Sequence, residues 1–194
     1  MADNKRVVIV GIPGVGKTTV ISRLVQTLQQ KGSQVKHVVF GTVMLTKAVK
    51  KYGIRQRDEL RTLPVHAQRK LQVQAAKAIA EMKASVLIVD THLFIKTKEG
   101  YWPGLPFDVL NALTPTNLVL LEASASEILE RRLRDKSRYR DALEEPKILR
   151  ELELARTMFA ASAVVTGTPV LTVRNEQWRV KKAAREISTS LGFT

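Results

Sequence analysis

The residues that decide the fold are VVIVGIPGVGKTT, Val7 to Thr19. The apolar run at residues 7–10 is followed by a glycine-rich stretch, and then by apolar residues at helical spacing: Val20, Ile21, Leu24, Val25 and Leu28. In this context of strand, loop and helix, the pattern G-x-x-x-x-G-K-[ST] is typical of a loop that binds phosphate groups. Its specified positions are filled by Gly11, Gly16, Lys17 and Thr18.

Residues 11–19, here called the phosphate loop, carry the chemistry that a bound nucleotide requires. Gly14 and Gly16 allow a tight turn that directs several backbone N–H groups to one point, and the following helix adds a positive dipole there. Lys17 supplies a full charge for the outer phosphates, and the Thr18 hydroxyl is a ligand for Mg²⁺ carried by the nucleotide. An ordinary glycine-rich turn is the alternative, and the complete pattern with its flanks argues against it.

Length and composition limit the class of protein. The chain has 194 residues, of which 44% are hydrophobic, and this predicts one compact domain. No apolar run approaches the roughly eighteen residues of a membrane span, and the first strand begins too early for a secretory signal, so a cytoplasmic protein is expected. The absence of cysteine excludes disulfides, thiolate catalysis and cysteine-bound zinc.

The formal net charge of +14 indicates an anionic partner. Basic residues gather at 47–70, 131–140 and 174–185, although any one such run also fits a solvated helix face. Nucleic acid is one candidate partner, but aromatic residues make up only 5% of the chain and show no pattern for stacking on RNA bases. Small polyanionic ligands are therefore expected, and nucleic acid is not.

Apolar runs alternate with helical patterns along the chain, which predicts an α/β fold with a parallel sheet. Strands are expected at residues 5–11, 34–40, 86–90, 117–122 and 170–173. Helices are expected from the phosphate loop to residue 30, at 43–51, 65–84 and 108–113, after Ser124, and at 148–166 and 180–191. Residues 92–107 show turn signals without periodicity and are expected to form loops. Ile128, Leu129 and Leu133 are expected to face inward, and Trp178 to pack on the last helix.

Asp90 ends the apolar run VLIVD, which has the composition of a strand buried on both faces. A carboxylate at the carboxyl edge of a parallel sheet can hold the water shell of a nucleotide's Mg²⁺, so Asp90 is the second candidate metal residue. A cap or turn residue is the alternative, because Thr91 and His92 follow. The three histidines are scattered without metal-ligand spacing, so no zinc site is expected.

Two separate groups of cations predict two phosphate sites. One lies at residues 131–140, and the other comprises Arg55 to Arg61 together with Lys96. Arginine suits phosphate because its planar fork donates two parallel hydrogen bonds, and phosphoryl transfer needs in-line placement, Mg²⁺ and matched positive charge. We expect the helical segment at about 41–84 to bind the acceptor, and a short lid at about 134–146 to exclude water over the donor.

Seven pieces of sequence resemble the archaeal-type adenylate kinases, in the same order along nearly the whole chain. They are GIPGVGKTT, FGTVML, RDELRTL, IVDTH, IKTKEGYWPGLP, RRLRDKSRYRD and SAVVTG. DTH and G-Y-x-x-G-L-P are the rarest of them. The resemblance implies a three-layer P-loop kinase fold, a homotrimer, and reversible phosphoryl transfer from MgATP to AMP that gives two ADP.

The resemblance also implies roles for individual residues. Lys17, Arg138 and Arg140 are implied as catalytic. The implied ATP-binding residues are Gly11, Ile12, Pro13, Gly14, Val15, Gly16, Lys17, Thr18, Thr19, Arg138 and Asn175, the last of them close to the adenine. The implied AMP-binding residues are Gly41, Thr42, Arg57, Arg61, Lys96, Arg140 and Arg156. Thr18 and Asp90 are the implied residues for Mg²⁺, through the nucleotide and water.

This sequence departs from the family pattern at two positions, and it leaves other functions open. Lys98 stands where proline is usual, and Tyr139 where asparagine is frequent. No residue reads an adenine edge directly, so a kinase acting on CMP, UMP or dAMP is the first alternative. An ATP-dependent RNA-processing factor is the second. For Arg156, spacing alone fits a solvated surface position nearly as well.

Overall fold

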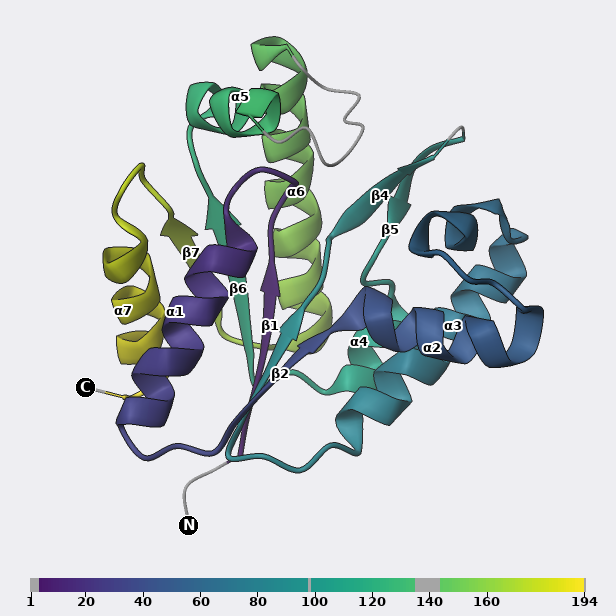
Figure 1. Cartoon of the computed structure of the whole chain (residues 1–194), viewed down its shortest axis with the longest axis horizontal. Coiled ribbons are helices and arrows are strands. Elements are labelled where there is room, and N and C mark those ends of the chain that lie inside the picture. The colour runs from purple at the N-terminus through teal and green to yellow at the C-terminus, as the bar shows by residue number, and fades with distance from the viewer. Residues whose placement is uncertain (1–3, 98, 135–143, 194) are drawn as a thin grey trace.

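The structure, a computed structural model, describes residues 4–97, 99–134 and 144–193, with the backbone alone for Arg57, Asp58 and Arg61. Its centre is a five-stranded parallel sheet with the order β2-β3-β1-β6-β7 (Figure 1). The strands are β1 (Lys5–Val10), β2 (Val35–Val39), β3 (Val86–Asp90), β6 (Asn117–Glu122) and β7 (Val170–Arg174). The predicted α/β fold is confirmed, and each strand boundary lies within one residue of its expected place.

Helices cover both faces of this sheet and form the two outer layers (Figure 1). They are α1 (Lys17–Gln30), α2 (Phe40–Tyr52), α3 (Val65–Ala80), α4 (Phe107–Leu113), α5 (Ala125–Arg134), α6 (Glu145–Thr166) and α7 (Val180–Ser190), with a short 3₁₀ helix η1 (Arg57–Thr62). α1 packs on α7 along one side, whereas α3 packs on α4 along the other. No helix in the described part of the chain is long and apolar enough to cross a membrane.

Burial of apolar side chains explains why the central strands and α6 form as the sequence predicts. Val7 to Val10 of β1 are fully buried, as expected for a strand covered on both faces. The predicted inward stripe of α6 is buried as well: Ile148, Leu152, Ala155, Phe159 and Ser162. This core fixes the carboxyl ends of the strands, from which the loops of the site emerge.

Three helix boundaries differ from the expectation by three residues or more. α6 begins at Glu145 rather than residue 148, with a proline in its first turn, where proline is tolerated. α2 begins at Phe40 rather than residue 43, because the chain passes from β2 into the helix without a loop and the Phe40 side chain is buried. α3 ends at Ala80 rather than residue 84, although the composition stays helical. The chain must reverse there to begin β3 at Val86, and this tertiary demand overrides the local propensity.

The expectation of a loop over residues 92–107 is wrong for the eight residues of a hairpin and for Phe107, the first residue of α4. Phe94–Thr97 and Gly100–Pro103 form the antiparallel strands β4 and β5, a hairpin beyond the carboxyl ends of the main sheet (Figure 1). Each strand has only four residues, too few to show alternation in the sequence. The edge-to-face contact of Phe94 and Tyr101, with ring centroids 5.0 Å apart, joins the two strands.

The predictions that Leu133 faces inward and that Trp178 packs on the last helix are wrong. Leu133 is 59% exposed, because it lies five positions after the buried Ile128 and points to another side of α5. Trp178 is 88% exposed, because it lies in the turn before α7 with a positive φ of 63° and does not reach the core. Leu129 packs partly buried against the core, as expected.

Gly104 attaches the hairpin to the end of β3. Its N–H donates to the Leu93 carbonyl at 2.7 Å, and a Cβ atom at Gly104 would lie only 2.0 Å from the carbonyl oxygen of His92. Backbone atoms cannot yield as a flexible side chain does, so a residue with a side chain does not fit. The two rarest sequence pieces, DTH and G-Y-x-x-G-L-P, therefore meet in one close backbone contact.

We expect Gly104→Ala to lower the free energy of unfolding by at least about 2 kcal/mol, because the added methyl group must displace the backbone at His92. Gly32→Ala is the matched control: Gly32 has a φ of +80° but open space around it, so only conformational strain of about 1 kcal/mol is expected. Urea denaturation of both variants measures the difference. Equal losses would contradict the close contact.

Candidate nucleotide-binding site

The phosphate loop leaves the central strand β1 and enters α1 at the carboxyl edge of the sheet. A Cβ atom at Gly11 would lie 2.6 Å from the Leu121 carbonyl oxygen of β6. Gly14 and Gly16 have φ values of +96° and +86°, in the region that favours glycine. The glycines of the phosphate loop thus meet different requirements: Gly11 allows a close approach to β6, and Gly14 allows a left-handed turn.

The Lys17 side chain contacts residues at the ends of β1 and β3. Its Nζ atom donates to the Gly11 carbonyl at 2.9 Å, and lies 4.0 Å from Asp90 Oδ1 and 3.3 Å from His92 Nδ1. The side chain is only 8% exposed, and a charged group in such a place requires polar partners. The structure therefore brings together two residues predicted separately, Lys17 and Asp90, and adds His92.

The sequence analysis does not predict a place for His92 in the site, because His92 shares no metal-ligand spacing with the other histidines. Its Nδ1 atom lies 3.3 Å from the Gly11 carbonyl oxygen, so the ring contacts both the loop and Lys17. A signal was present, since His92 follows the buried strand that ends in Asp90. Any polar residue just beyond the carboxyl end of a central parallel strand lies at the edge where ligands bind.

The oxygen atoms at this edge fit a magnesium ion carried by a nucleotide. Thr18 is exposed in the first turn of α1, and the Asp90 carboxyl group is 14% exposed at the end of β3. Mg²⁺ prefers oxygen ligands and retains water, so one hydroxyl and one carboxylate suffice beside phosphate oxygens. Within the described ranges, no cluster of three or more histidine or acidic residues forms a dedicated metal site.

Asn175 contacts the backbone of the phosphate loop. It follows β7 with 3% of its surface exposed, and its Nδ2 atom donates to the Val15 carbonyl at 2.8 Å. A Cβ atom at Gly16 would lie 2.5 Å from that Nδ2 atom, which is a second reason for glycine there. The implied position near an adenine ring stays a prediction.

The residues Arg131 and Arg132, which belong to the cation group assigned to the donor, turn toward the loop backbone. Arg131 Nη1 donates to the Val15 carbonyl at 3.2 Å and contacts that of Gly14 at 3.5 Å. Arg132 donates to the Pro13 carbonyl through Nε at 2.9 Å and Nη2 at 2.8 Å. Sequence spacing did not reveal this role, because the loop lies more than a hundred residues away.

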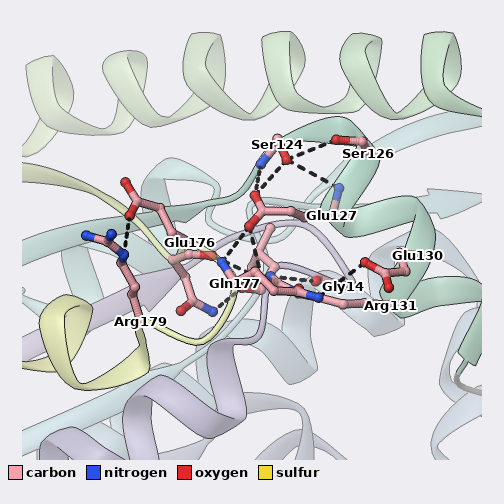
Figure 2. A network of polar contacts seen from close by, with 11 residues as sticks. Gly14, Ser124, Ser126, Glu127, Glu130, Arg131, Glu176, Gln177 and Arg179 are labelled. Atoms are coloured by element: carbon pink, nitrogen blue, oxygen red, sulfur yellow. Dashed lines mark hydrogen bonds and ion pairs between the residues drawn. The ribbon is translucent and has the colours of Figure 1, made fainter.

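Glu127 joins α5 to the turn before α7 (Figure 2). Its carboxylate accepts hydrogen bonds from the Ser124 N–H at 2.9 Å and hydroxyl at 2.6 Å, which forms a capping box at the start of α5. It also accepts from the Gln177 N–H at 2.5 Å and lies 3.7 Å from Arg131. Burial raises the pKa of Glu127, but these hydrogen bonds and the Arg131 charge outweigh it, so the pKa is lowered.

The implied acceptor residues lie on several elements. Gly41 and Thr42 are in the first turn of α2, Lys96 is exposed on β4, and Arg57 and Arg61 lie in η1. Arg156 on α6 donates to both oxygens of Glu122, at 2.7 and 3.2 Å, and this hydrogen bonding raises the pKa of Arg156. Glu122 ends β6, so Arg156 is held at the ligand edge. Arg138, Tyr139 and Arg140 lie outside the described residues.

We expect Glu127→Gln to reduce stability by about 1 kcal/mol at neutral pH, because the amide loses the charge-assisted bonds of the carboxylate. A lowered folded pKa contributes stability above the ordinary value of 4.5, and that stability is lost as the pH falls through the folded pKa. The difference between wild type and variant should therefore shrink below pH 4.5. Denaturant unfolding over this range tests it. Glu130→Gln, which removes an exposed ion pair with Arg134 and keeps an amide oxygen as acceptor for the Gln177 side chain, should show little pH-dependent difference.

Comparison with known proteins agrees with this geometry. A family model described as an AAA domain matches residues 10–149. The adenylate kinase of Methanocaldococcus jannaschii is 44% identical over 185 residues, which cover 95% of this chain and 96% of that protein. The adenylate kinase of Sulfurisphaera tokodaii is 41% identical over 189 residues, 95% of this chain and 97% of that protein.

Solved structures share the fold at low sequence identity. A shikimate kinase from Bacteroides thetaiotaomicron superposes with a TM-score of 0.64 at 14% identity, covering 97% of this chain and 98% of that one. A gluconokinase from Sinorhizobium meliloti gives 0.55 at 14% identity, covering 99% and 94%. These likenesses show the P-loop kinase fold alone. The similarity along the whole sequence shows more: the chain belongs to the archaeal-type adenylate kinase family.

Proposed function

We propose that this protein catalyses reversible phosphoryl transfer from MgATP to AMP, giving two ADP. The observation that carries the proposal is the gathering of Lys17, Asp90 and the phosphate loop at one edge of the sheet, in a chain whose relatives are adenylate kinases. Phosphoryl transfer requires a protein to position the reacting groups and to supply positive charge, rather than to form covalent bonds. This edge of the sheet can do both.

On the donor side, residues 11–19 and Asn175 bind ATP in this proposal. Lys17 exchanges its contact with the Gly11 carbonyl for the outer phosphates, where its charge stabilises the transition state more than the ground state. Thr18 and Asp90 hold Mg²⁺, which supplies charge neutralisation on the phosphate oxygens when it is bound. Arg138 and Arg140, within the lid at about 134–146, place further positive charge on the transferred group.

On the acceptor side, the helical segment at about 41–84 binds AMP, with Gly41 and Thr42 near its base. Arg57, Arg61 and Lys96 contact its phosphate. Support comes from their place on η1 and β4, beyond the carboxyl end of the sheet (Figure 1). Arg156 exchanges its carboxylate partner Glu122 for phosphate oxygens, because both present the same bidentate geometry to a guanidinium group.

A panel of nucleoside monophosphates with MgATP tests the acceptor. We expect the highest kcat/KM with AMP, and lower values with CMP, UMP and dAMP. A preference for CMP of more than about tenfold would show that the acceptor site reads another base. ATP hydrolysis that RNA stimulates, while AMP has no effect, would support the RNA-processing alternative instead.

We expect Lys17→Ala to remain folded and to lower kcat at least about a hundredfold, because a transition-state cation is lost. The matched control is Lys181→Ala, which removes an exposed lysine on α7 and should leave kcat unchanged. Coupled-enzyme assays of ADP formation and circular dichroism give the two measurements. Turnover of the Lys17 variant near the wild-type rate would remove Lys17 from the reaction.

The proposal extends to assembly and location. We propose a single adenylate kinase domain over residues 1–194 in the cytoplasm, and a homotrimer, which the resemblance implies. Light scattering would support the trimer with a mass three times the 21.7 kDa of one chain.

A further inference from the structure

Three consecutive carbonyl groups on the outer side of the phosphate loop accept hydrogen bonds from side chains. The Pro13 carbonyl accepts from Arg132, the Val15 carbonyl accepts from Arg131 and Asn175, and Arg131 also reaches the Gly14 carbonyl. These donors come from α5 and from the end of β7, both distant in sequence. The loop is thus held from outside as well as by its own turns.

Arg132 is deeply buried. Its side chain is 3% exposed, and its Nη2 atom bridges the Pro13 carbonyl at 2.8 Å and Glu151 Oε2 at 2.7 Å. The Glu151 side chain, on α6, is 10% exposed. A buried guanidinium needs a charged partner, and Glu151 supplies it while setting the direction of the planar fork. α5, α6 and the phosphate loop are joined through this one side chain.

The orientation of the carbonyl groups fixes the orientation of the N–H groups. The described chain has no cis peptide bond, and in a trans peptide the N–H group of the next residue points opposite to the carbonyl group. When the carbonyls of residues 13, 14 and 15 are held outward, the N–H groups of residues 14, 15 and 16 face the inside of the loop. An anion cradle requires that arrangement.

We propose that Arg132, oriented by Glu151, is a positioning residue that holds the phosphate loop in its phosphate-binding form. Arg132 acts through the Pro13 carbonyl and does not itself contact ATP. The inference rests on the proposed function only in taking the phosphate loop as the ATP site. α5 also packs on the loop next to this contact, since a Cβ atom at Gly14 would lie 3.2 Å from Arg132 Cγ.

The test compares ATP and AMP affinity in Arg132→Lys. Lysine keeps the charge but has no planar fork to span Pro13 and Glu151, so the loop carbonyl loses its fixed partner. Calorimetric titration with MgATP and, separately, with AMP should show ATP affinity lower by about tenfold and AMP affinity changed less than about twofold. Arg185→Lys, which alters an exposed arginine on α7, should change neither affinity.

A second variant removes the orienting charge and leaves Arg132 in place. We expect Glu151→Gln to lower ATP affinity by about threefold or more, again without an equal loss for AMP. The double variant should lose less than the product of the two single losses, because both act through one contact. If Arg132→Lys does not fold, the ATP and AMP affinities of Glu151→Gln alone test the positioning role.

The outcomes separate this inference from the proposed function. ATP affinity within twofold of wild type in the folded variants, or equal losses for ATP and AMP, would overturn the positioning role. A wild-type protein that binds no MgATP would overturn the proposed function instead. A wild-type protein that prefers CMP would change the proposed acceptor and leave the ATP comparison intact.

Discussion

The arrangement of this protein depends on a single requirement of backbone geometry. A loop that presents its N–H groups to an anion must turn its carbonyl groups the other way, and buried carbonyl groups need hydrogen-bond donors. Here those donors are Arg131, Arg132 and Asn175. Much of the positive charge of the α5 segment thus serves the loop's carbonyl groups rather than the nucleotide directly. Counting arginines in the sequence cannot make that distinction.

The parallel sheet explains why residues from four parts of the chain meet. The phosphate loop, Asp90, Glu122 and Asn175 each follow or end a strand, and parallel strands end at the same edge. Lys17 occupies the centre of that edge because β1 is the middle strand. The Glu122–Arg156 pair and the Glu127 network both lie on the β6 and β7 side of that edge, and Figure 2 shows the Glu127 network.

Close backbone contacts connect the edge that carries the phosphate loop to the hairpin. Gly104 admits the His92 carbonyl, and His92 in turn contacts Lys17 and the phosphate loop. The hairpin that carries Lys96 is therefore anchored beside His92, whose ring contacts the Lys17 ammonium group. This contact gives a physical reason for the two rarest sequence pieces: the His92 carbonyl of DTH packs against Gly104 of G-Y-x-x-G-L-P, where a side chain does not fit.

The sequence by itself determined the fold class, the strands, the phosphate loop and the family, because these depend on local patterns: apolar runs, helical spacing and glycines at set positions. The place of Asp90 at the carboxyl edge of the sheet was also predicted, since a carboxylate that ends a buried strand is a local signal. The hairpin was missed because its strands are too short to alternate visibly, and Leu133 and Trp178 were misplaced because burial depends on what lies opposite. Only the tertiary structure decided that Arg131 and Arg132 face the loop backbone, that His92 joins Lys17, and that Arg156 pairs with Glu122. Such contacts join residues far apart in the chain, and no local pattern encodes their direction.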